Sequence, residues 1–126
     1  MGVKGMDKFT KEELEDALLI VSSTINKCEK IQPKFAEGTS QYSLLTNRIK
    51  ALVIAKLLLI GEKVDNYSDE ELTEALRPLT SIINKCTKAQ LKHSEGSPHH
   101  NKHQNIIKAM SISKSFIANE IATWDK

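Results

Sequence analysis

Apolar residues between positions 14 and 35 recur at alternating spacings of four and three, the periodicity of one face of an α-helix. The same spacing returns 58 residues later in the chain. The positions are Leu14, Leu18, Val21, Ile25, Cys28, Gln32 and Phe35 in the first stretch, and Leu72, Leu76, Leu79, Ile83, Cys86, Gln90 and His93 in the second. This pattern predicts two amphipathic helices that present equivalent faces to a core.

Each of these helices is followed by a second helical segment. The returning helices are expected from about Ser40 to Lys63 and from about Pro98 to Asp125. The segment from Ala51 to Ile60 is apolar nearly all round, apart from Lys56. A helix of that kind must be buried on more than one side. Since one hairpin cannot cover it alone, we expect two helical hairpins to pack together.

The two hairpins are copies of one unit. Residues 9–62 and 67–120 align without gaps, and 22 of the 54 positions are identical. Each copy begins with the spacing of a capping box, Thr10 with Glu13 and Ser68 with Glu71. The chain is therefore predicted to be all-α: a four-helix up-down bundle built from two tandem hairpins with pseudo-two-fold symmetry.

Turn residues mark the ends of the predicted helices. Gly38 and Gly96 stand where a helix needs a C′ residue at positive φ. Thr39 and Ser97 are expected to cap the returning helices, with Pro98 at the first helical position. Pro78 departs from the repeat because its counterpart is Ile20, and it is expected to kink the third helix.

Length and composition fit one soluble domain spanning residues 1–126, of which residues 1–8 are expected to be disordered. The 126 residues are 40% apolar and 27% charged, as in ordinary globular proteins. The start of the chain lacks the apolar region of a signal peptide, and no apolar run is long enough to span a membrane. We expect a cytoplasmic protein without membrane association or cofactor, and a monomer or weak homodimer.

Four histidines lie within eleven residues: His93, His99, His100 and His103. On a helix, His99 and His103 are one turn apart, and His100 is three residues from His103, so these three form a weak candidate metal site. Their counterparts are Gln41, Tyr42 and Leu45, and no carboxylate is spaced to complete the set. A polar, solvated start of a helix is the favoured interpretation of this cluster.

Lysines form matching stripes near the end of the first helix of each copy. These candidate binding residues are Lys27, Lys30, Lys34, Lys85, Lys88 and Lys92. Two basic stripes are a candidate surface for nucleic acid or phosphate. The favoured explanation is that lysines near helix ends, opposite acidic helix starts, stabilise the helix dipoles.

Cys28 and Cys86 occupy equivalent positions on the apolar faces and are expected to be reduced, buried thiols. Gln32 and Gln90 lie on the same faces, where a buried amide needs a partner. We expect them to bond across each hairpin to Asn47 and Asn105. A pair of equivalent binding sites near the two turns is the alternative for these retained polar residues.

No combination of residues in the sequence resembles a catalytic set or a phosphate-binding loop. We therefore expect a small, non-catalytic protein–protein interaction module with an unidentified protein partner. A nucleic-acid- or phosphate-binding protein that uses the lysine stripes is one alternative. A bundle that binds a metal or small ligand through the histidine cluster is the other. An exposed apolar patch on the folded chain would favour the first reading.

Overall fold

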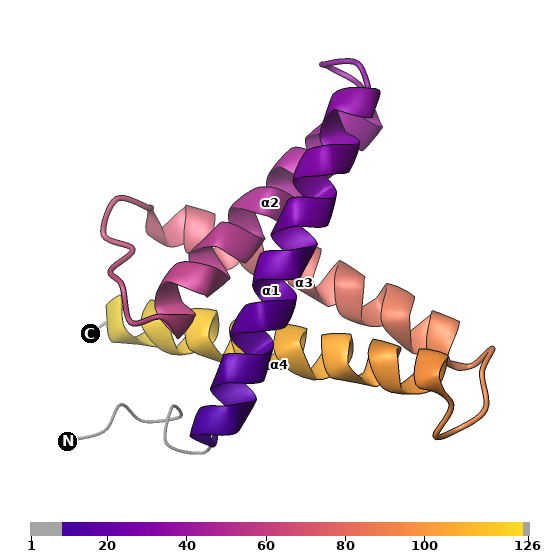
Figure 1. Ribbon diagram of the computed structural model, residues 1–126. Helices are drawn as coiled ribbons and strands as arrows, with labels where there is room; N and C mark the ends of the chain where they lie inside the picture. Colours follow the sequence, from indigo (N-terminus) through magenta and orange to yellow (C-terminus); the bar gives the residue numbers. More distant parts are fainter. Residues whose placement is uncertain (1–8, 125–126) are drawn as a thin grey trace.

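The computed structural model describes residues 9–124, which form four α-helices, a short 3₁₀ turn and no strand (Figure 1). The prediction of an all-α chain with four helices is confirmed. The elements are α1 (Lys11–Ile31), η1 (Gln32–Lys34), α2 (Ser40–Leu59), α3 (Asp69–Gln90) and α4 (Pro98–Trp124). Residues 1–8, expected to be disordered, lie outside the described residues.

Local sequence signals set where the helices begin. Thr10 and Ser68 each accept a hydrogen bond from the backbone N–H of the glutamate three residues on, and that glutamate's side chain accepts one from the cap backbone N–H. Both predicted capping boxes are thus confirmed. Thr39 and Ser97 cap the returning helices through bonds from the N–H groups of Tyr42 and His100. Each cap provides a partner for a backbone donor that has none within its helix.

Among the described residues, three glycines have positive φ, and they differ in their position relative to the helix ends. Gly38 (φ 89°) and Gly96 (φ 86°) belong to the turns between helices and lie several residues beyond the helix ends at Ile31 and Gln90, so their predicted C′ positions were wrong. Gly61 (φ 83°) has the C′ role instead, and α2 ends at Leu59 rather than near Lys63. Around it, the N–H groups of Gly61 and Glu62 donate to the carbonyls of Leu58 and Leu57, which is a Schellman motif.

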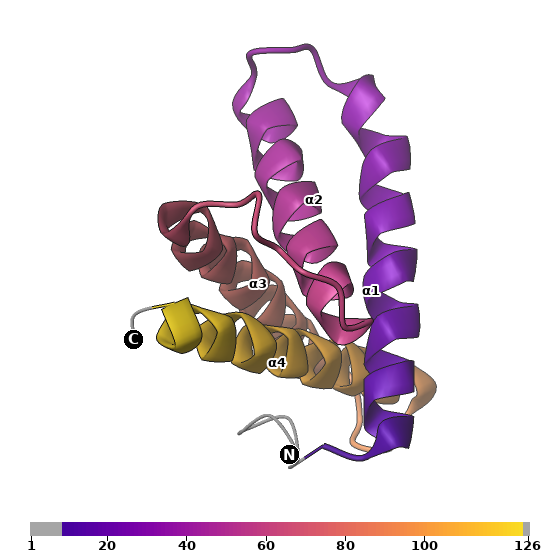
Figure 2. The ribbon, with the colours of Figure 1, turned by 90° about the vertical axis from the view of Figure 1, so that its left-hand side faces the viewer.

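The helices form two antiparallel hairpins, α1–α2 and α3–α4, which cross each other steeply (Figures 1 and 2). Their tips point to different sides of the molecule. This arrangement refines the predicted up-down bundle, since the helices do not share one axis along their whole length. The lysine-rich second halves of α1 and α3 explain this, because polar helix surfaces gain nothing by being buried against the other hairpin.

Small residues occupy the places where helices of different hairpins cross. Ala17 and Ala109 are 2% exposed between α1 and α4, and Ala51 and Ala75 are 1% and 5% exposed on α2 and α3. A methyl side chain lets two helix axes approach closely at a crossing. These alanines are equivalent positions in the two copies, so both crossings are built alike.

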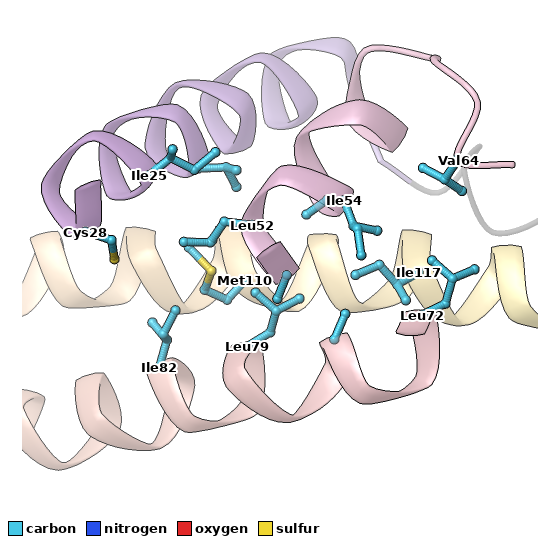
Figure 3. Packing of buried hydrophobic residues seen from close by; sticks show 14 of the residues in the cluster. Ile25, Cys28, Leu52, Ile54, Val64, Leu72, Leu79, Ile82, Met110 and Ile117 are labelled. Atoms are coloured by element: carbon cyan, nitrogen blue, oxygen red, sulfur yellow. The ribbon is translucent and has the colours of Figure 1, made fainter. Parts of the chain in front are cut away.

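All four helices contribute to one main core (Figure 3). Met110 of α4 lies beside Leu52 of α2 and near Leu79 of α3, and all three side chains are fully buried. The apolar segment of α2 is buried on several sides, as predicted, with Ala51, Leu52, Ile54 and Ala55 all inside. A smaller cluster around Ala17, Ala109, Ile112 and Phe116 includes Phe9, whose ring stacks on Phe116 at 6.2 Å.

Candidate functional site

Two ion pairs join the hairpins, and they involve equivalent residues of the two copies. Lys108 of α4 binds the Glu13 carboxylate of α1 at 2.8 Å, and Lys50 of α2 binds the Glu71 carboxylate of α3. Hydrogen bonds from these lysines, together with the backbone N–H of each N-cap, hold the pKa of both glutamates below its usual value. The same bonds raise the pKa of both lysines. One carboxylate therefore serves both a helix cap and a contact between hairpins.

A cleft lies beside each ion pair, and the two clefts have equivalent linings. At the α2–α3 crossing the cleft measures about 190 Å³. Its counterpart at the α1–α4 crossing measures about 330 Å³. The equivalent pairs are Asn47 and Asn105, Lys50 and Lys108, Ala51 and Ala109, Glu71 and Glu13, Glu74 and Asp16, and Ala75 and Ala17.

On the α2–α3 side, the cleft shares Arg77 with a hollow of about 650 Å³ that is lined by α3 residues. On the α1–α4 side, the cleft continues into another hollow, which lies between α1 and α4. This hollow of about 420 Å³ shares Leu19, Ile20 and Asn105 with that cleft. Its other lining residues are Ser23, Thr24, Lys27, Pro98, Asn101, Lys102 and Ile106. We call the two together the α1–α4 groove. Its lining residues come from α1 and from the first half of α4.

The α1–α4 groove has an apolar floor that is open to solvent. Leu19 is 70% exposed and lines the groove together with the half-buried Ile20 and Ile106. The equivalent positions in the other copy are Arg77, Pro78 and Arg48. A single exposed leucine is ordinary on a protein surface, but here Leu19 adjoins two further aliphatic side chains in a groove, and contiguous apolar surface is typical of partner-binding sites. The repeat thus yields two similar crossings, of which one has an apolar groove.

The six candidate lysines are all exposed, and the structure does not bring the two stripes together. Those of α1 lie toward the tip of the first hairpin and those of α3 toward the tip of the second (Figures 1 and 2). Lys27 is also part of the α1–α4 groove. Nucleic-acid or phosphate binding by the stripes stays a prediction.

The histidines come together at the tip of the second hairpin. His93 stacks on His99 with ring centroids 4.9 Å apart and on His103 at 6.0 Å. Burial, and then the neighbouring His99 and His103, hold the pKa of His93 below its usual value. Within residues 9–124, no three histidine, cysteine or acidic side chains are placed to hold a metal ion. The sequence pointed to His99, His100 and His103, whereas the stack contains His93 in place of His100.

Gln32 and Gln90, on the apolar faces of the first helix of each hairpin, form hydrogen bonds across their own hairpins, but not to the predicted asparagines. Gln32 donates to the hydroxyl of Thr46, and Gln90 donates to Oε1 of Gln104 at 2.7 Å. The helical phase explains the error, because Thr46 and Gln104 face the first helix while the exposed Asn47 and Asn105 face the clefts. Cys28 is buried as expected, whereas Cys86 is only half-buried; burial raises the pKa of both thiols.

No protein-family model, curated protein or solved structure matches the chain. Within the described residues, no helix is both long and apolar enough to cross a membrane.

Proposed function

We propose that this protein is a non-catalytic, cytoplasmic interaction module that binds a protein partner in the α1–α4 groove. The observation that carries the proposal is the apolar floor of this groove, in which Leu19 is 70% exposed. Burying a leucine side chain contributes about 1.5–3 kcal/mol. A few buried side chains near the centre of an interface supply most of its binding free energy.

The occupant that suits this groove is an amphipathic helix of the partner. An extended peptide would leave its backbone N–H and C=O groups unpaired against the helix walls, which offer no free backbone edge. Few side chains can replace that edge, because Thr24 already donates to the carbonyl of Ile20 and Asn101 to that of Gly96. A helix satisfies its own backbone and needs only to insert apolar side chains.

Substitution of the groove leucine tests the proposal. Helix-forming peptides are selected from a displayed library against the parent protein, and their affinities are measured by fluorescence anisotropy. Leu19→Arg is the sharpest variant, since the chain itself has arginine at the equivalent position 77. We expect it to weaken binding by about 10- to 100-fold, from the loss of one buried leucine.

Leu91→Arg is the matched control. Leu91 is 83% exposed and lies outside the groove, so the control makes the same chemical change and should leave peptide binding intact. Circular dichroism checks that both variants stay folded. The proposal is wrong if no peptide is selected, or if Leu19→Arg and Leu91→Arg weaken binding equally.

We further propose that the two hairpins arose by duplication and are related by an approximate two-fold axis. The paired contacts support this, because Lys108 with Glu13 and Lys50 with Glu71 are the same contact seen from either copy. A monomer with this internal symmetry has the packing of an isologous dimer within one chain. An experimental structure tests it: the rotation that superposes residues 10–59 on residues 68–117 should be close to a half turn.

A further inference from the structure

The charged residues of the α1–α4 groove are separated along its length. At the crossing end, Lys108 faces the carboxylates of Glu13, Asp16 and Glu12, and all three act on its pKa. Glu13 forms the ion pair with Lys108, and Asp16 has no ion-pair partner among the described residues. This end of the groove is therefore acidic, with more carboxylates than ammonium groups.

The opposite end of the groove is basic. Lys27 of α1 and Lys102 of α4 both line the hollow of about 420 Å³, and no acidic side chain lines this hollow. Both lysines are exposed and neither forms an ion pair among the described residues. The α1 wall between the two ends, from Glu13 to Lys27, rises about 21 Å at 1.5 Å per residue, which equals about four helical turns.

The floor between these ends carries no charge. Leu19, Ile20 and Ile106 are its apolar side chains, and Ser23 and Asn105 are the nearby polar ones. Complementary charges at the rim of an interface set orientation and association rate, while apolar side chains at its centre supply most of the affinity. The apolar centre of the groove thus suits the apolar stripe of a helix, and its oppositely charged ends favour one orientation of that helix in the groove.

Resting on the function proposed above, we infer that the partner is a helix of about four turns with an apolar stripe, acidic side chains at one end and basic side chains at the other. Its acidic end lies between Lys27 and Lys102, and its basic end lies beside Asp16. The equivalent surface of the other copy lacks the apolar centre for such a helix, because Arg77 and Arg48 replace Leu19 and Ile106. One partner helix binds per chain.

Two synthetic peptides of identical composition test this inference. Both carry the same leucine stripe over about 16 residues, a length set by the four turns of the groove wall. The segregated peptide has its glutamates at one end and its lysines at the other, and the scrambled peptide has them interspersed. We expect the segregated peptide to bind at least about tenfold more tightly at low salt, and the advantage to shrink at high salt, since exposed charges are screened.

Charge reversal in the protein tests whether the basic end of the groove recognises the acidic end of the peptide. The double variant Lys27→Glu with Lys102→Glu should weaken the segregated peptide about tenfold and change the scrambled peptide little. Lys85→Glu with Lys88→Glu is the matched control, because it makes the same change in net charge on α3, outside the groove. It should leave both affinities as they are.

The outcomes separate this inference from the function on which it rests. If both peptides bind with equal affinity and Leu19→Arg abolishes the binding of both, the proposed binding function of the groove is supported. The inference that the partner helix has segregated charges is then wrong. The same conclusion follows if the two double variants have equal effects. If neither peptide binds, or Leu19→Arg changes nothing, the proposed function fails together with the inference. Isothermal titration gives the stoichiometry, and two bound helices per chain would also contradict it.

Discussion

The α1–α4 and α2–α3 crossings begin from the same plan and then diverge. Each has a lysine from a returning helix on the capping-box glutamate of the other hairpin, and buried alanines where the axes meet. Beyond that layer, the α1–α4 side presents Leu19 and Ile106. The α2–α3 side presents Arg77 and Arg48 instead. The shared contacts join the hairpins, and the residues that differ give the two surfaces different chemistry: aliphatic at the α1–α4 crossing and cationic at the α2–α3 crossing.

Arg48 shows that this divergence has a cost. Its Nε and Nη2 atoms are buried without a hydrogen-bond partner, where the other copy has the apolar Ile106. A buried donor without a partner loses its bonds to water and gains nothing in return. The apolar groove in one half and the unpaired guanidinium nitrogens in the other are thus associated with different residues, Ile106 and Arg48, at equivalent positions.

The largest expected effect tests whether both halves share one core. Leu52 and Met110 are equivalent positions, and both side chains are fully buried. Truncation of either to alanine should lower the free energy of unfolding by about 2–5 kcal/mol. Because the main core includes residues from all four helices, each variant should still unfold in a single transition. Urea denaturation followed by circular dichroism measures both quantities. Two separate transitions would show that the hairpins unfold independently.

The next effect concerns the proline that distinguishes α3 from α1. α3 runs from Asp69 to Gln90 through Pro78, whose counterpart in α1 is Ile20. A proline inside a helix costs about 3 kcal/mol relative to a good helix former, because it lacks an N–H and crowds the preceding turn. Pro78→Ile should therefore stabilise the protein by about 1–3 kcal/mol, after some of that cost has been absorbed by the surroundings. An unchanged urea midpoint would show that the proline is fully accommodated.

Local features of this fold were predictable from sequence because local interactions produce them. The capping boxes at Thr10 and Ser68 depend on residues three positions apart, and the structure confirms both. The end of α2 was predicted too late because the signal of Gly61 was missed. The crossing of the hairpins was not predictable from periodicity, which records which face of a helix is apolar but not the angle at which two faces meet.

The candidate groove could not be predicted from the sequence either, because it depends on how the hairpins cross. Leu19 and Ile106 are far apart in sequence and come together only because α1 crosses α4. A signal was nevertheless present in the repeat: an aliphatic residue in one copy and an arginine in the other at both positions. The histidines and Pro78 are also differences between the copies, but they lie outside the apolar part of the groove.

A smaller effect is expected when the divergent arginine is returned to the residue of the other copy. Arg48→Ile should stabilise the protein by about 1 kcal/mol, because it removes buried donors that lack partners. The positive charge of Arg48 also lowers the pKa of Cys28 and of Cys86 against the larger effect of burial. Both thiols should therefore react more slowly with iodoacetamide in the variant at pH 8. Faster reaction would show that Arg48 protects the thiols sterically.

The smallest expected effect is a difference between the two hairpin tips in how their local stability depends on pH. His93 stacks on His99 and His103, and Lys92 and His100 are the other charged or titratable groups that act on it. Its pKa in the folded protein is lowered from 6.5, so the unfolded tip binds protons more readily than the folded one. The contribution of the stack is complete above pH 6.5 and is lost as the pH falls below it. Amide hydrogen exchange of residues 91–100, corrected for the intrinsic rate, should therefore speed up from pH 7.5 to pH 5.5.

The first hairpin provides the control within the same molecule. At its tip, Phe35 is the counterpart of His93, and Gln41 and Leu45 are the counterparts of His99 and His103. None of these side chains titrates near neutral pH, so residues 33–42 should exchange at the same corrected rate at both pH values. His93→Phe should give the second tip the same insensitivity. If that variant responds to pH as the parent does, the response comes from a source other than the stack, and the two tips differ for another reason.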